Sequence, residues 1–212
     1  MKIISWNINN DYRGINLKVY NIINLLEKYS PNIIGLQEVI PKVYDLLCNE
    51  DIIKNRYIIS EKQDKSYFNI ILTKFKTPME IIPFKNSSMG REYIKQKIGK
   101  VSFINIHLES MPVNRGVRDK QINEILSNTE DYMIIFGDTN FTDDGEKFGN
   151  LNYIEFINDN DLFTYDSKIN KEAIPPFRSN LDRFYTNMDE GSYKAKIIPC
   201  DGSDHYPILL EC

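Results

Sequence analysis

The sequence has 212 residues, 42% of them hydrophobic, and a formal net charge of -4 at pH 7. A chain of this length can bury one sizeable core, and no linker-like tract of Pro, Gly or Ser divides it, so we expect residues 1–212 to form a single domain without an accessory domain. The negative charge argues against capture of nucleic acid by the surface as a whole, but a small site could still hold a cation and a phosphate.

No apolar segment approaches the length of a membrane span, and the first residues lack the long apolar core of a signal peptide. We therefore expect a soluble, intracellular protein, in the nucleus or the cytoplasm, with no membrane partner. Cys48, Cys200 and Cys212 are odd in number and far apart, which argues against a disulfide framework or a zinc site and predicts buried, reduced thiols.

The first half of the chain mixes strands and helices at unequal intervals. Strands are predicted at residues 2–8, 33–39, 57–60, 68–73 and 79–83, and helices at residues 16–29 and 43–47. The first helix is indicated by Val19, Ile22 and Leu26, which recur at helical spacing, and Ser30-Pro31 ends it.

The second half continues this irregular order. Strands are predicted at residues 93–97, 101–108, 132–136, 181–186 and 206–211, and helices at residues 117–126 and, in part, 145–158. Residues 93–97 and 101–108 would form a hairpin across Gly99-Lys100. The helix at residues 117–126 would place Ile122 and Ile125 on its apolar side and Arg118 elsewhere. An α/β fold of two packed sheets with helices outside fits this order better than a regular βαβ alternation.

The residues at 133–140, Met-Ile-Ile-Phe-Gly-Asp-Thr-Asn, form the centre of the prediction. An apolar strand stops at Gly137, and a carboxylate and a carboxamide follow it. If the extended backbone continues, Asp138 and Asn140 share one face of the strand. The alternative is a turn, because Gly, Asp, Thr and Asn are all turn residues.

Polar side chains recur at the ends of the predicted strands. They are Asn7, Glu38, His107, Asp138 with Asn140, Asp182, and Asp204 with His205. One apolar strand that ends in a carboxylate is common, but six such cases that include both histidines of the chain indicate a site.

These groups suit metal-assisted hydrolysis of a phosphoester. Mg²⁺ takes one or two carboxylates and keeps several waters, so Glu38 is the best candidate ligand, with Asp204 or Asp138 second. A histidine beside a carboxylate stays cationic near neutral pH and can stabilise charge on a phosphorane, as His205 beside Asp182 would. The alternative for His205 is a capping or turn residue.

The ordered polar series resembles the endonuclease/exonuclease/phosphatase superfamily of metal-dependent phosphodiesterases. Within it, several segments are similar to those of the 5′-tyrosyl-DNA phosphodiesterases. These segments are Leu36-Gln37-Glu38-Val39-Ile40-Pro41, Ile81-Ile82-Pro83-Phe84 followed by Met89-Gly90-Arg91, His107-Leu108-Glu109-Ser110, and Gly137-Asp138-Thr139-Asn140.

The resemblance implies a four-layer α/β/β/α sandwich of the DNase I-like type, formed by two mostly antiparallel sheets, as one catalytic domain. It also implies roles for the residues at the strand ends. Glu38 would bind Mg²⁺, or Mn²⁺ in its place, with Asn7 and Asp204 close to the metal. Asp138 would position or deprotonate the attacking water, and Asn140 would orient the phosphate. His107 and His205 would hydrogen-bond to the phosphate, and Asp182 would orient His205.

The implied substrate is a single-stranded or 5′-overhang DNA end that carries a tyrosyl adduct from a trapped topoisomerase. Its hydrolysis would leave a 5′-phosphate end in DNA repair, and the enzyme would act as a monomer. By the same resemblance Arg91, Ser110 and Arg118 would lie along the DNA groove, and Tyr165 would stack on a base. The alternatives are solvated arginines and a core aromatic residue.

Two other functions stay open from the sequence. A related phosphodiesterase could act on abasic DNA, RNA ends or a protein-linked RNA with the same metal residues and a different groove. A catalytically inactive binding module of the same fold is disfavoured, because a decayed site would be expected to lose at least one member of the polar set.

Overall fold

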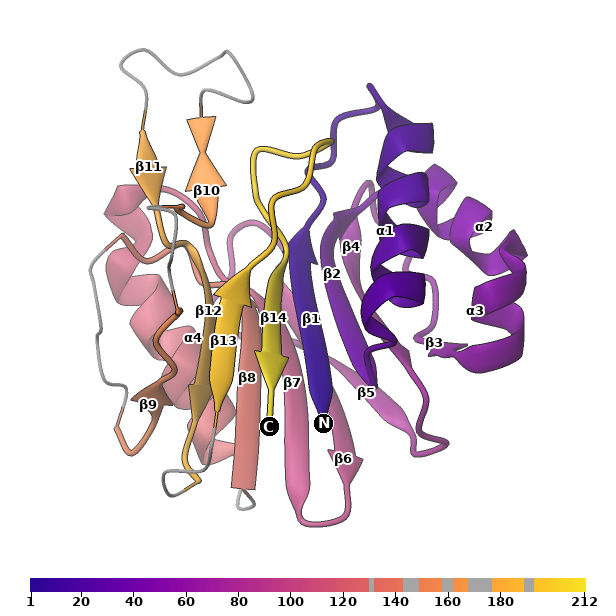
Figure 1. Ribbon diagram of the computed structural model, residues 1–212. Helices are drawn as coiled ribbons and strands as arrows, with labels where there is room; N and C mark the ends of the chain where they lie inside the picture. Colours follow the sequence, from indigo (N-terminus) through magenta and orange to yellow (C-terminus); the bar gives the residue numbers. More distant parts are fainter. Residues whose placement is uncertain (130–131, 143–148, 158–161, 168–176, 189–192) are drawn as a thin grey trace.

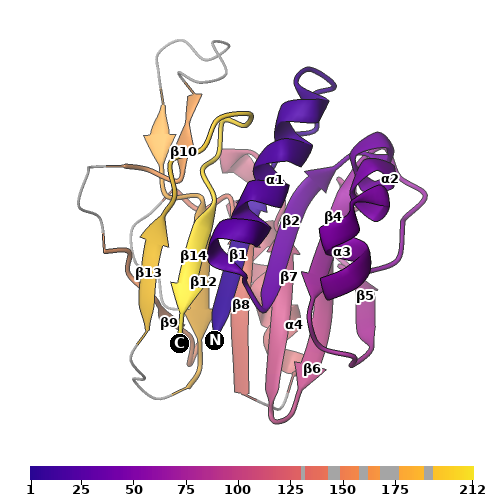
Figure 2. The same ribbon diagram turned by 45° about the vertical axis from the view of Figure 1, so that its right-hand side comes forward.

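The computed structural model describes residues 1–129, 132–142, 149–157, 162–167, 177–188 and 193–212. In this part of the chain two six-stranded sheets pack face to face, with helices on both outer faces (Figure 1). Helices α1, α2 and α3 cover one sheet, and α4 covers the other on the opposite side of the molecule (Figure 2). The predicted four-layer α/β/β/α sandwich is confirmed.

The sheet that contains the N-terminal strand has the order β13-β14-β1-β2-β4-β3. Its β1/β2 pair is parallel and its other pairs are antiparallel. Its strands are β1 (Lys2–Asn7), β2 (Ile33–Val39), β3 (Ile58–Ile59), β4 (Phe68–Thr73), β13 (Lys194–Ile197) and β14 (Ile208–Glu211).

The second sheet has the order β5-β6-β7-β8-β12-β9, and here only the β7/β8 pair is parallel. Its strands are β5 (Met79–Pro83), β6 (Glu92–Ile98), β7 (Val101–His107), β8 (Tyr132–Asp138), β9 (Asn152–Tyr153) and β12 (Asp182–Thr186). A separate two-stranded ribbon, β10 (Tyr165–Asp166) and β11 (Arg178–Ser179), rises above one end of the sheets (Figure 1).

Each parallel pair is connected through a helix. The helix α1 (Ile15–Tyr29) connects β1 to β2, and α4 (Arg115–Ser127), preceded by the 3₁₀ turn η1 (Pro112–Asn114), lies between β7 and β8. The remaining helices are α2 (Pro41–Asn49) and α3 (Asp51–Arg56). Because parallel strands end at the same edge of a sheet, the residues that follow β1, β2, β7 and β8 meet at one end of the sandwich.

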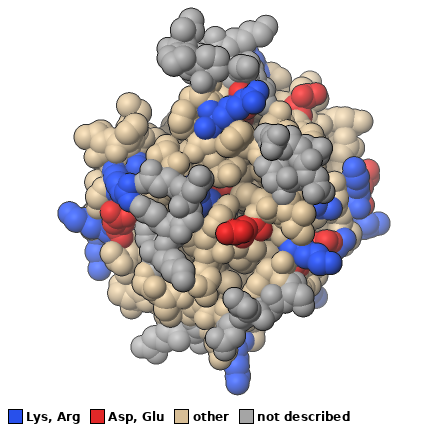
Figure 3. Space-filling view, turned by 60° about the vertical axis from the view of Figure 1, so that its left-hand side comes forward, with Lys and Arg blue, Asp and Glu red and all other residues tan. Residues whose placement is uncertain are grey.

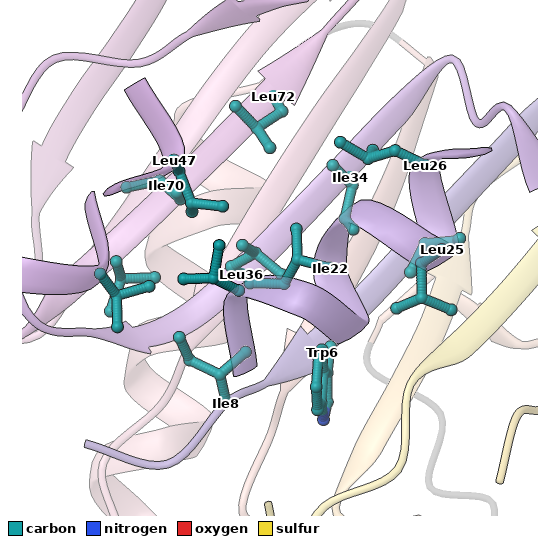
Figure 4. Close-up of a cluster of buried hydrophobic side chains, with 14 of the residues drawn as sticks. Trp6, Ile8, Ile22, Leu25, Leu26, Ile34, Leu36, Leu47, Ile70 and Leu72 are labelled. Carbon is teal, nitrogen blue, oxygen red and sulfur yellow. The ribbon is translucent and has the colours of Figure 1, made fainter. Parts of the chain in front are cut away.

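Three apolar layers hold the sandwich together. The layer between the first sheet and its helices contains Trp6, Ile22, Leu26 and Leu36, and its side chains interdigitate (Figure 4). A second layer, with Phe103, lies between the sheets, and a third lies between the second sheet and α4. In the described residues no helix is long and apolar enough to cross a lipid bilayer.

Long apolar runs predicted the strands well, and the hairpin across Gly99-Lys100 is confirmed. The helix expected within residues 145–158 is wrong for residues 149–157, where β9 instead pairs with β12; residues 145–148 and 158 lie outside the described residues. The structure adds α3, β10, β11 and β13, which are too short to show a period in the sequence.

Two predictions about single side chains also need correction. Arg118 lies on the inner face of α4 and is buried, because its spacing of four and seven residues from Ile122 and Ile125 puts it on the apolar side. All three cysteines are free thiols, but Cys48 and Cys200 are half-buried and Cys212 is exposed.

Candidate active site

The polar residues at the strand ends come together at one end of the sandwich, opposite the chain termini (Figure 1). Asn7 Nδ2 donates to Asp138 Oδ2 at 2.9 Å and so connects the two sheets. His107 Nε2 lies 3.5 Å from the same oxygen and 3.8 Å from Glu38 Oε1. His205 Nε2 lies 3.9 Å from Asp138 Oδ2. Asp138 is therefore the centre of the group.

The chain turns directly after Asp138. The Asn140 N–H donates to Asp138 Oδ1 at 2.9 Å, and Asn140 has a left-handed φ of 52°. The turn alternative is thus the correct one for Asn140, because the extended backbone of β8 ends at Asp138. Asn140 Nδ2 donates to the Leu108 carbonyl at 3.1 Å, so its carboxamide is held against the end of β7.

Irregular backbone also orients Glu38. The pairing of β2 with β4 shifts register between Leu36 and Val39, and Glu38 has a left-handed φ of 58°. A bulge turns one side chain away from the alternation of the strand, and a left-handed non-glycine residue is found mostly where function or packing requires it. The carboxylate of Glu38 is consequently partly exposed near the end of an otherwise buried strand.

His205 is buried and is held by Asp182. Its Nδ1 lies 2.7 Å from Asp182 Oδ2. Burial opposes a charge on the ring, but the charge and hydrogen bond of Asp182 outweigh burial and raise the pKa of His205 from 6.5 to about 10. The indole N–H of Trp6 donates to the His205 carbonyl, so the core anchors the backbone here as well. His205 is therefore a cation at neutral pH.

His107 is buried beside an arginine. Arg91 Nη1 lies 2.9 Å from His107 Nδ1. A guanidinium can only donate, so Nδ1 must accept, and the neutral ring carries its proton on Nε2. Burial, with the nearby charges of Arg91 and His205, holds the pKa of His107 well below 6.5. Among the described residues Nε2 has no hydrogen-bond partner, so this buried N–H faces the site.

Asp138 combines burial with three polar neighbours. Burial raises the pKa of Asp138 to about 7, against the opposing effect of the His205 cation and of the hydrogen bonds from Asn7 and Asn140. A carboxylate with a pKa near the operating pH is suited to accept a proton from water. The site thus contains one cationic histidine, one neutral histidine and one basic carboxylate.

The residues present fit a hard divalent cation. Asn10 N–H donates to Glu38 Oε2 at 2.9 Å, and Asn9 Nδ2 donates to Asp204 Oδ1 at 3.0 Å, so both predicted carboxylate ligands face the loop after β1. Within the described residues no group of three His, Cys, Asp or Glu is arranged to hold an ion by itself. One or two carboxylates, completed by water and phosphate oxygens, are what Mg²⁺ takes.

A buried lysine holds the loop that faces these carboxylates. Lys18, on α1, is 2% exposed, and its Nζ donates to the carbonyls of Asn9 and Asp11. The sequence analysis missed it because a lysine in a helix is normally solvated. Its spacing of four residues from Ile22 was the available signal, since this places it on the buried face.

The predicted groove residues separate into two groups. Arg91 and Ser110 lie together at the site, with Arg91 Nη2 2.9 Å from Ser110 Oγ. Arg118 instead donates to the carbonyls of Glu109 and Met111 and lies over the Phe141 ring.

Tyr165 lies on the opposite flank. Its ring meets the His205 ring edge-on at a centroid distance of 4.9 Å.

An aromatic residue that the sequence analysis missed lies beneath Arg91. The guanidinium carbon of Arg91 is 5.5 Å from the centre of the Tyr67 ring, a cation–π geometry. Both residues line an open pocket of about 350 Å³, together with Lys65, Asn69 and Met89. Tyr67 directly precedes β4, and this position just outside an apolar strand was its only signal.

The stacked sheets and the polar residues at the strand ends fit a family of hydrolases. The sequence profile of the Endonuclease/Exonuclease/phosphatase family matches residues 4–205, and the chain belongs to this family.

Among its relatives are tyrosyl-DNA phosphodiesterase 2 of Mus musculus, 30% identical over 99% of this chain and 65% of the relative, and that of Xenopus tropicalis, 27% identical over 92% of this chain and 58% of the relative. The chain thus spans about three fifths of the length of these relatives.

Solved structures show the same fold. The D. rerio TDP2 complexed with a single-strand DNA product superposes with a TM-score of 0.82 at 24% identity, over 99% of this chain and 97% of that one. C. elegans TDP2 gives a TM-score of 0.81 at 24% identity, over 99% and 74%. ANGEL2, described as a 2′,3′-cyclic phosphatase, gives 0.70 at 12% identity, over 99% and 94%.

Proposed function

We propose that this protein is a Mg²⁺-dependent phosphodiesterase that hydrolyses the 5′-phosphotyrosyl bond between DNA and a protein remnant of a topoisomerase, and leaves a 5′-phosphate for DNA repair. The observation that carries the proposal is the convergence of Glu38, His107, Asp138 and the Asp182–His205 pair at one end of the sandwich. The similarity to tyrosyl-DNA phosphodiesterases along almost the whole chain supports the choice of substrate.

The roles of the residues follow from their charge states. Asp138 takes up a proton from the attacking water, and its pKa of about 7 suits this role. The His205 cation and the Nε2–H of neutral His107 donate to phosphate oxygens, where negative charge grows as the bond to water forms. Asn140 helps to orient the phosphate, and Asn7 holds Asp138 in place.

The leaving group needs little help from the protein. A tyrosine phenol has a pKa of about 10, so the phenolate departs readily when the phosphorus–oxygen bond breaks. Bound to Glu38 and Asp204, Mg²⁺ (or Mn²⁺ in its place) would supply Lewis-acid stabilisation of charge on the phosphate. Arg91 above Tyr67, with Ser110, would contact the DNA end or the tyrosyl group at the rim.

Recognition of DNA would be local. Among the described residues on the face shown in Figure 3, Lys and Arg side chains are scattered and form no continuous basic surface. This agrees with the net charge of -4. We propose a single-stranded or 5′-overhang end as the preferred substrate, with base stacking on Tyr165 as a prediction from the sequence. The groove position predicted for Arg118 is not proposed again, because its side chain is buried. One catalytic domain over residues 1–212, a monomer and an intracellular location also stay predictions.

The test is hydrolysis of a 5′-phosphotyrosyl single-stranded oligonucleotide, with Mg²⁺ and after EDTA. We expect release of tyrosine that EDTA abolishes and added Mg²⁺ restores. Glu38→Gln and His205→Asn should each lower kcat by roughly a hundredfold or more, because each removes a charge at the reacting phosphate. Glu80→Gln, on the edge strand β5, is the matched control and should keep the parent rate.

Two further substrates make the result decisive. A duplex with an abasic site and a 5′-phosphotyrosyl RNA are assayed beside the DNA substrate. Cleavage of the abasic duplex alone would overturn the tyrosyl assignment and place the protein among repair endonucleases. Preference for the RNA would overturn the DNA assignment, and no hydrolysis of any substrate would point to a binding module.

A further inference from the structure

Glu109 is a buried carboxylate that the proposed reaction does not use. Its side chain is 0% exposed, and Oε1 accepts the N–H and the hydroxyl of Ser88 at 2.8 and 2.5 Å and the N–H of Met89 at 3.0 Å. Oε2 accepts the hydroxyl of Ser87 at 2.8 Å and Nε2 of Gln121 at 3.4 Å. Donors from three consecutive residues thus surround one carboxylate.

These donors take the place of a cationic partner. Among the ion pairs of the described residues none involves Glu109, so hydrogen bonds alone stabilise its charge. A carboxylate that accepts several N–H and O–H bonds is stabilised in its charged form. The hydrogen bonds from Ser88, Ser87 and Met89 outweigh burial and lower the pKa of Glu109. The charge therefore holds the exposed segment 87–89 against the end of β7.

The same segment positions Arg91. Ser87 Oγ donates to Glu109 and accepts the backbone N–H of Arg91 at 2.7 Å. The side chain of Arg91 then reaches back to the residues on either side of Glu109, to His107 Nδ1 and to Ser110 Oγ, each at 2.9 Å. Backbone and side chain of Arg91 are thus both attached to the short stretch that contains Glu109.

We infer that Glu109 is a positioning residue: its carboxylate keeps segment 87–91 folded so that Arg91 stays bonded to His107 Nδ1 and the His107 Nε2–H faces the reacting phosphate. Only the statement that the His107 Nε2–H faces the reacting phosphate rests on the proposed function. Without the Arg91 donor, neutral His107 could carry its proton on either nitrogen, and only one of these forms donates toward Asp138 and the phosphate.

The first experiment measures the His107 ring by ¹⁵N–¹H correlation NMR at a single neutral pH. The chain has only two histidines, so a His107→Gln sample assigns the signals. In the parent protein we expect an unprotonated Nδ1 and a protonated Nε2. In Glu109→Gln and in Ser87→Ala the two nitrogen shifts should move toward each other, as they do when both neutral forms are populated.

Glu124→Gln is the matched control. Glu124 also accepts a backbone N–H from this region, that of Lys85, but no hydrogen bond of the described residues joins its side chain to segment 87–91. Its substitution should leave the His107 shifts and the reaction rate at their parent values.

The second experiment measures kcat/KM on the phosphotyrosyl oligonucleotide. Glu109→Gln and Ser87→Ala should each lower it by roughly tenfold or more, the effect of a lost charge-assisted hydrogen bond. In an Arg91→Ala background, Glu109→Gln should cause little further loss, because both changes act through the same contact. Full additivity of the two losses would contradict the inference.

The outcomes separate this inference from the proposed function. Parent His107 shifts and parent kcat/KM in both Glu109→Gln and Ser87→Ala would overturn it. If Glu109→Gln does not fold, Ser87→Ala, which keeps the carboxylate, decides alone. A parent protein that hydrolyses no phosphotyrosyl substrate contradicts the proposed function, whereas the NMR experiment needs no substrate and tests the hydrogen-bond chain independently.

Discussion

Two histidines a few ångströms from one aspartate have opposite charge states in this site. His205 Nδ1 meets a carboxylate, and His107 Nδ1 meets a guanidinium. The carboxylate favours the charged ring, and the guanidinium excludes a proton from the nitrogen that it contacts. Both rings are buried, which favours the neutral form, and the partner at Nδ1 reinforces this effect at His107 and overcomes it at His205.

The Asp182→Asn substitution tests this at His205. The pKa of His205 is raised from 6.5 to about 10, so the stability from its ion pair is complete below pH 6.5 and is lost as pH rises through about 10. Without the carboxylate charge, burial dominates and the pKa of His205 falls. We expect the alkaline loss of kcat to move to lower pH in Asp182→Asn, and the His205 ring signals to titrate there too.

Asp45→Asn serves as the control for that experiment, because Asp45 lies on α2 and forms an exposed ion pair with Lys62. Its pH–rate profile should match that of the parent. An unchanged alkaline limb in Asp182→Asn would contradict the assignment of the charged form to His205.

At the scale of single elements, the strands that carry the site end irregularly. Gly137, with φ of 140°, brings the backbone of β8 so close to β7 that an added Cβ would lie 2.0 Å from the Ile106 carbonyl oxygen. No side chain fits there without moving the parallel pair apart. This glycine therefore allows β8 to place Asp138 beside His107.

Gly137→Ala should lower the free energy of unfolding by about 3 kcal/mol, from overpacking against backbone and from the unfavourable φ. Activity should fall further than stability, since Asp138 is the next residue. Gly116→Ala is the matched control: Gly116 lies in α4, where an added Cβ meets nothing within 4 Å, and alanine should be neutral or stabilise by about 0.5–1 kcal/mol. Urea denaturation of both variants checks the pair, and equal stabilities would refute the close approach.

Over the whole molecule, a polar contact between the sheets lies directly beneath the site. Gln37 Nε2, from the first sheet, donates to Asn105 Oδ1, from the second, at 2.6 Å, and Asn105 Nδ2 donates back to the Ile70 carbonyl at 2.9 Å. All three residues are fully buried. Because Glu38 follows Gln37 and His107 lies two residues after Asn105, this contact fixes one half of the site relative to the other.

Asn105→Leu should lower the free energy of unfolding by about 2–4 kcal/mol, because it leaves buried partners in both sheets without a hydrogen bond. Urea denaturation monitored by circular dichroism measures the loss. Asn49→Ala is the control, since the exposed Asn49 side chain donates to the Asp45 carbonyl within α2. Equal stabilities of the two variants would show that the contact between the sheets contributes nothing.

The sequence predicted those parts of the molecule that local patterns determine. The bounds of β2, β4 and β5 agree with the prediction because apolar residues make up most of each strand. The site was found through residues that follow such runs, among them Glu38 and Asp138. Family membership is confirmed, while the role of each site residue stays a prediction.

What the sequence could not predict depends on contacts between distant segments. Tyr67 matters because Arg91 lies over its ring, and Ser87 matters because its hydroxyl donates to Glu109, 22 residues along the chain. Neither contact leaves a local pattern in the sequence. The burial of Lys18 could have been predicted from helical spacing, but its two carbonyl partners could not.

The position of β14 has a consequence for how the protein is made. This strand lies between β13 and β1, where Leu210 pairs with Ile3. On the ribosome, β1 emerges long before β14, so one edge of β1 stays open after β2 has paired with the other edge. A nascent chain stalled before Ile208 would expose one edge of β1 and carry an unfinished first sheet, a form that invites pairing with other chains and calls for chaperone protection.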